Sequence, residues 1–221
     1  MSQSTADRIY EILRERIICG AVTPGIALRQ DEIARELGVS KIPVREALLK
    51  LEADGFVTFR KNRGATVRDL SSDEILNLIE IRAALECRAL ELAIPNMIDA
   101  DYETAAEILE TYAGTTQAAG LSALNLKFHQ ALYEPCGNHI LLRLISDVQQ
   151  RIGPALRAFV TQTSGLHRPH AEHREILAAC RAQDIGRAVS LLRDHIKTTR
   201  KEVAARLRRA AQEDSPAAFG T

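Results

Sequence analysis

The sequence contains no tryptophan, and aromatic side chains make up only 4% of its 221 residues. The hydrophobic residues, 46% of the chain, are therefore mainly Ala, Leu and Ile, which favour helices. This content is enough for a buried core in one large domain or two modest ones. The formal net charge is zero, so any binding of nucleic acid must come from a local basic patch.

Paired cysteines and long apolar runs are also missing. The four cysteines are far apart and no two have CxxC spacing, which excludes a thiolate zinc knuckle and a CxxC redox motif. No uncharged apolar run approaches ~18 residues, and the chain opens with a polar segment rather than a signal peptide. We therefore expect a cytoplasmic protein with reduced cysteines and no membrane span.

The first 70 residues show helical periodicity that changes to strand patterns. The apolar spacing predicts three helices, over residues 7–19, 30–37 and 41–54. Gly38 can take the left-handed conformation that ends the second helix, and Ser40 can cap the third. Two strand-like segments follow, over residues 56–60 and 65–68. This order predicts a helix-turn-helix followed by a β-hairpin, which is a winged helix-turn-helix.

Basic side chains gather in the second half of this region. Between residues 40 and 68, seven basic residues outnumber three acidic ones; the basic set is Lys41, Arg45, Lys50, Arg60, Lys61, Arg63 and Arg68. Lys41, Ile42 and Arg45 point away from the apolar stripe of the third helix, near the end that a recognition helix presents to the major groove. A helical hairpin with a solvated charged surface is the alternative, but the basic hairpin that follows favours DNA binding.

Strand patterns end near Ser71, where we expect a domain boundary. The rest of the chain predicts six helices, over residues 73–93, 99–118, 121–134, 138–163, 168–181 and 184–209. Gly153-Pro154 should kink the fourth of these. The fold class is therefore mainly α: a winged helix-turn-helix over residues 1–70, a six-helix bundle over 73–210 and a disordered tail over 211–221.

The N-terminal region resembles the winged head of the GntR family of regulators. The matching segments are Pro24-Gly25-x-x-Leu28, Glu32-Ile33-Ala34-x-x-Leu37-Gly38-Val39-Ser40-Lys41-Ile42-Pro43-Val44-Arg45-Glu46-Ala47-Leu48, Leu51-Glu52-Ala53-Asp54-Gly55-Phe56 and Asn62-Arg63-Gly64. The resemblance implies a set of DNA-contacting residues, namely Ser40, Lys41, Pro43, Arg45, Asn62, Arg63 and Gly64. Lys41 stands where the family usually has Arg, which removes a bidentate fork for guanine. Asp31 stands where some members have a DNA-contacting Arg.

Three histidines lie on the apolar faces of three separate predicted helices: His129, His173 and His195. Asn125 is one helical turn before His129, so its side-chain oxygen points the same way. Three imidazoles and one oxygen suit a divalent metal such as Zn, Ni or Mn. The alternative is three unrelated core histidines, each satisfied by hydrogen bonds. We expect His167 and His170 to be exposed in a turn and His139 to begin a helix.

The C-terminal region resembles the FCD-type effector domain of the FadR subfamily, and six helices rather than seven resemble its VanR-like branch. The matching segments are Glu80-Ile81-Arg82-x-x-Leu85-Glu86, Asn125-x-x-Phe128-His129-x-x-Leu132, Gly137-Asn138, Glu172-His173-Arg174-x-Ile176-Leu177 and Asp194-His195. The resemblance implies a metal set of Asn125, His129, His173 and His195. Asn125 replaces the family's Asp and lowers the negative charge of the site.

Arg82 shares the apolar stripe of the first C-terminal helix, where an arginine is costly unless it meets an anion. It is either a clamp for the carboxylate of an effector or the partner of Glu86 four residues later. We also consider Arg151, close to Gly153-Pro154, as an effector contact.

The leading hypothesis is a dimeric transcription regulator, expected to be a repressor, that binds a near-palindromic operator and senses a small organic acid beside a metal ion. One alternative is a metal-dependent enzyme with a DNA-binding head. No residue is placed as a general base beside the histidines, and no catalytic fingerprint is present. Another alternative is a regulator for which the metal itself is the signal.

Overall fold

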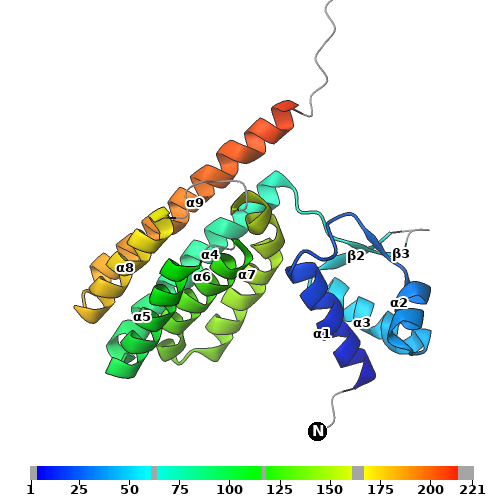
Figure 1. The fold of residues 1–221 in the computed structure, drawn as a ribbon, viewed down its shortest axis with the longest axis horizontal. Helices are drawn as coiled ribbons and strands as arrows, with labels where there is room; N and C mark the ends of the chain where they lie inside the picture. Colours follow the sequence, from blue (N-terminus) through cyan, green and yellow to red (C-terminus); the bar gives the residue numbers. More distant parts are fainter. Residues whose placement is uncertain (1–3, 61–63, 116–117, 161–166, 214–221) are drawn as a thin grey trace, which may run out of the picture. The chain divides into compact units, whose positions relative to one another are not determined.

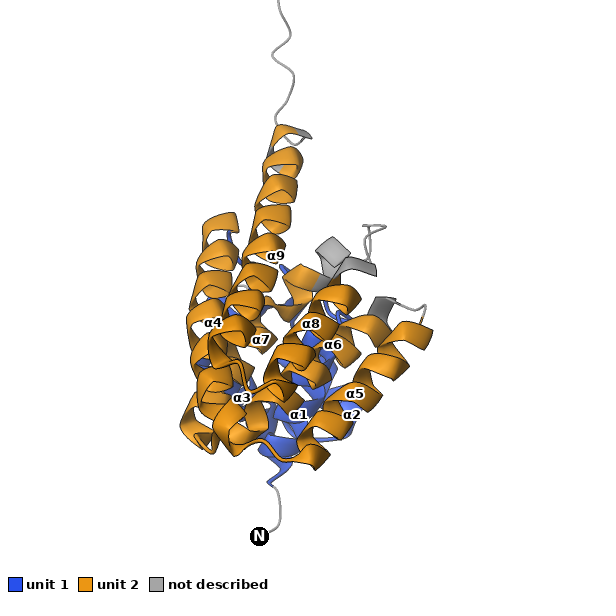
Figure 2. Cartoon of the chain, turned by 90° about the vertical axis from the view of Figure 1, so that its left-hand side faces the viewer, with its two compact units in different colours: residues 1–71 blue, residues 72–221 orange. Residues whose placement is uncertain are grey.

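The computed structural model describes residues 4–60, 64–115, 118–160 and 167–213. The chain divides into two compact units, residues 1–71 and residues 72–221 (Figure 2). None of the helices in these described ranges is long and apolar enough to cross a membrane.

The first unit has three helices and a small sheet (Figure 1). Its elements are α1 (Thr5–Ile18), β1 (Ala27–Leu28), α2 (Gln30–Leu37), α3 (Lys41–Ala53), β2 (Val57–Arg60) and β3 (Gly64–Val67). The strands are antiparallel in the order β1-β3-β2, with Val57 opposite Val67 and Ala27 opposite Thr66. The helices and hairpin match the predicted winged helix-turn-helix. The two-residue strand β1 is too short to leave a period-2 pattern and was not predicted.

Local signals account for the turn between α2 and α3. Gly38 has φ 65° and ends α2 in the left-handed conformation that glycine adopts without steric cost. Ser40 is at the N-cap of α3 with an extended backbone, but among the described residues its side chain makes no capping hydrogen bond. The expected side-chain cap is therefore wrong, although the helix begins where the sequence predicts.

The core of the first unit lies under one face of α3. Val44, Ala47, Leu48 and Leu51 are completely buried and pack with α1 residues such as Ile9 and Leu13. This stripe leaves the opposite face of α3 in solvent, because residues three and four positions apart share one side of a helix. The core therefore decides which side chains of α3 are available to a partner.

The second unit is a bundle of helices. It contains α4 (Ser72–Ala93), α5 (Asp99–Gly114), α6 (Ala118–Tyr133), α7 (His139–Val160), α8 (His167–Arg181) and α9 (Ile185–Glu213), with the short 3-10 helices η1 (Ile94–Asn96) and η2 (Glu134–Cys136). α4 packs against α6, α7 and α9, while α5 packs against α6 and α8, and α8 against α9. All six predicted helices are present.

Some boundaries differ from the prediction. α5 ends at Gly114, four residues early, because glycine lowers helix stability and the following Thr115 is extended. α7 continues through Pro154 to Val160. α9 extends to Glu213, beyond its predicted end at residue 209. The rest of the predicted tail, residues 214–221, lies outside the described residues.

We predict that Leu48→Ala lowers the free energy of unfolding of the first unit by about 2–5 kcal/mol, because it opens a cavity in a fully buried site. The matched control is Leu49→Ala on the same helix, where the side chain is 47% exposed and the change should be within about 0.5 kcal/mol. Urea unfolding followed by circular dichroism measures both. Equal losses for the two variants would contradict this packing.

Candidate functional site

Two regions hold the residues that the sequence singled out, one in each unit. In the first unit they lie at the beginning of α3. Ser40, Lys41, Ile42 and Arg45 are exposed, and Pro43 is half-buried in the first turn of the helix. The structure thus places these side chains on one accessible surface, opposite the buried stripe. Gly64 begins β3 and is exposed, whereas Asn62 and Arg63 lie outside the described residues.

Lys41 and Asp31, the two residues that differ from the GntR pattern, contact each other. The Lys41 ammonium lies 2.5 Å from a carboxylate oxygen of Asp31, and this ion pair joins α3 to α2. Both side chains are more than 60% exposed, so the pair contributes little to stability. Its effect is on the surface charge, because Asp31 offsets the charge of Lys41. Arg45, by contrast, has no hydrogen-bond or ion-pair partner in the part of the chain that the structure describes.

In the second unit the three predicted histidines come together. His129 on α6, His173 on α8 and His195 on α9 each offer a ring nitrogen, and these nitrogens lie within 4.8 Å of one another. The ring centroids are 4.9 Å apart for His129 and His173, 4.8 Å for His173 and His195, and 5.4 Å for His129 and His195. All three rings are buried. Helical periodicity alone located each ring on an inward face, and the bundle packing makes the faces converge.

The hydrogen bonds of these rings do not satisfy all their nitrogens. Nε2 of His129 and both nitrogens of His173 are buried without a partner among the described residues. Buried polar atoms of native proteins are normally paired, and leaving one unpaired costs about 1–3 kcal/mol. The described residues therefore do not supply the hydrogen bonds that the alternative of three separately satisfied core histidines requires at His129 Nε2 and at His173. A cation held between the rings would use these orphaned nitrogens, so the residues fit a metal ion.

Neighbouring side chains orient two of the rings. His195 Nδ1 lies 2.6 Å from a carboxylate oxygen of Glu172. In the neutral tautomer that donates a hydrogen bond from Nδ1 to this oxygen, the lone pair is on Nε2. His129 Nδ1 lies 3.1 Å from the Tyr133 hydroxyl oxygen. Tyr133 donates its own proton to Glu86 at 2.8 Å, so its oxygen accepts from His129. With its N–H on Nδ1, His129 then carries its lone pair on Nε2. Partners of this kind orient ligating histidines in metal sites.

Burial sets the charge state of the cluster. It lowers the pKa of His129 well below its ordinary value, and the charges of His173, His195 and Arg82 act in the same direction. Burial, together with the charges of His195, His170 and Arg82, lowers the pKa of His173 to about 2. Both imidazoles are therefore neutral at pH 7, which is the state that ligates a metal.

Arg82 belongs to a buried network beside the histidines. Its Nε donates to Glu86 Oε1 at 2.7 Å, and Gln149 Nε2 donates to the same oxygen at 2.6 Å. Glu86 is completely buried, and Tyr133 donates to its other oxygen. Of the two roles considered for Arg82, the structure contains the ion pair with Glu86. Because Arg82 lowers the pKa of His129 and His173, its charge also reaches the cluster.

The sequence reasoning missed several members of this network. Tyr133 is four residues after His129, so the helical spacing could have identified it. Glu172 directly precedes His173 in the sequence, but adjacent helix positions do not share a face, so the spacing does not predict its contact with His195. The sequence does not identify Gln149 on α7, because nothing in its local sequence shows that α7 packs against α4 at Glu86.

The other candidates differ in their burial. Asn125 is half-buried on α6, one turn before His129, and Arg151 is exposed on α7. His170 was expected to be exposed in a turn, but it lies within α8, half-buried, with its ring stacked on Tyr112 at 5.9 Å. The turn prediction failed because Pro169 falls in the first turn of α8, where proline is tolerated. His139 begins α7 as expected, and the side chain of His167 is outside the described residues.

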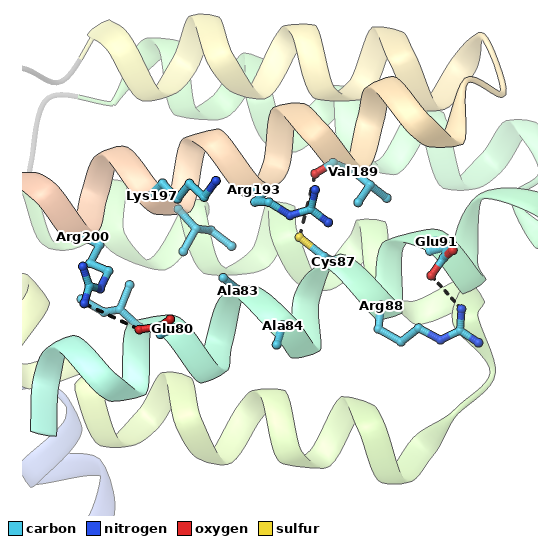
Figure 3. A pocket seen from close by; sticks show the side chains of 12 residues that line it. Glu80, Ala83, Ala84, Cys87, Arg88, Glu91, Val189, Arg193, Lys197 and Arg200 are labelled. Atoms are coloured by element: carbon cyan, nitrogen blue, oxygen red, sulfur yellow. Dashed lines mark hydrogen bonds and ion pairs between the residues drawn. The ribbon is translucent and has the colours of Figure 1, made fainter.

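A separate cavity of about 630 Å³ opens between α4 and α9. Figure 3 shows Arg193 and Lys197 of α9 across from Ala83 and Cys87 of α4. Neither the three histidines nor Arg82 line this cavity, so it is not the interior of the histidine cluster.

Family comparisons agree with the geometry of both units. A family profile for bacterial regulatory proteins of the gntR family matches residues 5–67, and one for the FCD domain matches residues 77–198. The chain belongs to the GntR family. Its FCD domain, with six α-helices in the described residues, agrees with the FadR subfamily and its VanR-like branch.

Individual GntR relatives match along most of the chain. It is 31% identical over 200 residues to the HTH-type transcriptional repressor GlaR of Escherichia coli (strain K12), covering 86% of this chain and 91% of GlaR. It is 29% identical over 177 residues to the regulator McbR of the same organism, covering 78% and 80% of the two chains. The solved structure of E. coli McbR/YncC superposes with a TM-score of 0.79 at 25% identity, over 96% of this chain and 100% of that one. The protein is thus a GntR-type transcription regulator, and the enzyme alternative is wrong.

We predict that Tyr133→Phe lowers the free energy of unfolding of this regulator by about 1–3 kcal/mol. The change removes a donor from buried Glu86 and an acceptor from His129. Tyr102→Phe is the control in the same unit. The Tyr102 hydroxyl accepts from Gln183 and donates to the Cys180 carbonyl, but the residue is partly exposed, so that water can replace these bonds. Denaturant unfolding compares the two, and an equal cost would show that the buried network does not stabilise the bundle.

Proposed function

We propose that this GntR regulator is a repressor that binds its operator as a homodimer and responds to a small organic acid at a metal centre in the FCD domain. The observation that carries the sensor part is the set of three converging imidazoles with buried, unpartnered nitrogens. Buried nitrogens without a partner are costly in a core, and a bound ion would satisfy them.

The metal would be a divalent ion such as Zn, Ni or Mn, held by His129, His173, His195 and the side-chain oxygen of Asn125. Imidazole nitrogens suit these ions. When bound, the ion supplies open coordination positions that a carboxylate can occupy. Glu172 and Tyr133 hold the His195 and His129 rings with their lone pairs available.

An anionic effector is favoured by the charges around the cluster. A bound cation would attract a carboxylate, and Arg82, although paired with Glu86, contributes to lowering the pKa of His129 and His173. Arg82 is a candidate carboxylate contact, for which it would share its guanidinium with Glu86. Arg151 remains a second candidate, from an exposed position on α7.

Dimerisation and repression rest on further observations. Ile81 on α4 and Ile140 and Leu144 on α7 are 48%, 74% and 48% exposed, on two helices that pack together. Exposed apolar side chains of this size are typical of surfaces that a second subunit covers. Two DNA-binding heads in a two-fold dimer require two half-sites and hence a near-palindromic operator. The relative GlaR is named a transcriptional repressor.

We predict that Arg45→Ala weakens operator binding by about 1–3 kcal/mol, because it removes a cation from the exposed surface of α3. Fluorescence anisotropy with DNA from upstream of the protein's own gene, at fixed salt, measures this loss. Lys50→Ala is the control on the same helix, since Lys50 pairs with Asp7 and is in the last turn. Thermal stability should be unchanged in Arg45→Ala. A large loss of stability would instead make Arg45 a structural residue.

We predict about one divalent ion per chain in the purified protein, lost in His173→Ala with helix content retained. The matched control is His139→Ala, which removes an exposed histidine and should keep the ion. Elemental analysis and circular dichroism give the two readouts. A full complement of metal in His173→Ala would remove His173 from the site.

The same preparations distinguish two hypotheses, in which the signal is either an organic acid or the metal itself. Operator affinity is compared for chelated protein, metal-loaded protein and metal-loaded protein with a panel of small carboxylates. A response only to an acid supports effector sensing. A response to loading alone makes the metal the signal.

A further inference from the structure

Ile42 is an apolar side chain that the fold of its own unit does not use. It is 71% exposed in the first turn of α3, the highest exposure of any large hydrophobic side chain in the described residues of the first unit. The buried stripe of α3 begins at Val44 on the opposite side. Packing within this unit does not use the side chain, which leaves it available to a partner of the exposed surface of α3.

The charged residues beside Ile42 indicate the chemistry of this partner. Lys41 precedes it and is already paired with Asp31 at 2.5 Å. To read a guanine, Lys41 would have to leave this carboxylate, and it would offer a single ammonium instead of a guanidinium fork. Arg45 lies one turn further along the same exposed face without a partner among the described residues. Among the described residues at this end of α3, the surface therefore presents an apolar group beside the unpaired cation of Arg45.

DNA supplies a matching pair of features. In the major groove the one apolar feature of the base edges is the C5-methyl group of thymine, which apolar side chains contact. The phosphate backbone or a guanine edge would meet Arg45. We propose that Ile42 is a specificity-determining residue that recognises the methyl group of one thymine in each operator half-site. This inference rests on the proposed binding of an operator by α3.

The test removes that methyl group and nothing else. In the operator bound by the full-length protein, each thymine of one half-site is replaced in turn by deoxyuridine, and affinity is measured at fixed salt. We expect one position at which the wild-type protein loses about fourfold in affinity, the change for burial of one methyl group. Substitution in both half-sites should multiply the loss to about sixteenfold, since well-separated positions add in free energy.

Variants of the protein complete the cycle. Ile42→Ala should bind the thymine operator more weakly and should no longer distinguish thymine from uracil at that position. Leu49→Ala, which shortens another exposed apolar side chain on α3 (47% exposed), should keep the distinction. A 5-methylcytosine placed opposite guanine at the same position should restore part of the affinity for wild type and none for Ile42→Ala.

The outcomes separate this inference from the proposed function. If uracil has no effect at any position, or if the effect persists in Ile42→Ala, the role of Ile42 is overturned while Arg45-dependent operator binding still stands. If the wild-type protein shows no sequence preference for any DNA, both the inference and the proposed operator binding fail.

Discussion

The second unit depends on one buried carboxylate. Glu86 is completely removed from solvent, and an unpaired charge in that position would be prohibitively costly. Three donors from three helices compensate it: Arg82 of its own helix, Tyr133 of α6 and Gln149 of α7. Because the Tyr133 hydroxyl donates its hydrogen bond to Glu86, its oxygen accepts one from Nδ1 of His129. This bond sets the orientation of the His129 imidazole. The hydrogen bonds that join α4 to α6 and α7 at Glu86 and the orientation of the His129 ring thus belong to one network.

This network also gives the proposed sensor a direct connection to α4. α4 begins at Ser72, immediately after the first unit ends at Ser71. A ligand that changes the orientation or charge of His129 acts on Tyr133, and through it on Glu86, the carboxylate with which Arg82 forms its ion pair. Such coupling requires that the ligand prefer one arrangement of the helices over another. The hydrogen-bonded chain identifies side chains through which that preference could be expressed.

In the first unit the core determines which face of α3 is exposed. The apolar stripe of α3 packs against α1, and the side chains at the start of the opposite face, such as Ile42 and Arg45, are exposed. Residues on that face can then vary with the operator while the fold is kept. The Lys41–Asp31 pair illustrates this freedom, since two substitutions relative to the family pattern contact each other at the surface. The pair changes the chemistry presented to DNA without touching the core.

Periodicity and short-range signals in the sequence determined the helices, the hairpin, the inward faces of His129, His173 and His195, and the exposure of Lys41, Ile42 and Arg45. These properties follow from neighbours three or four residues apart, so local physics decides them. Tertiary structure alone decided that the three imidazoles meet, that Tyr133 and Gln149 complete the shell of Glu86, and that His170 stacks on Tyr112. These contacts join residues of different helices, and which helices pack together depends on the burial of whole faces rather than on any short segment of sequence.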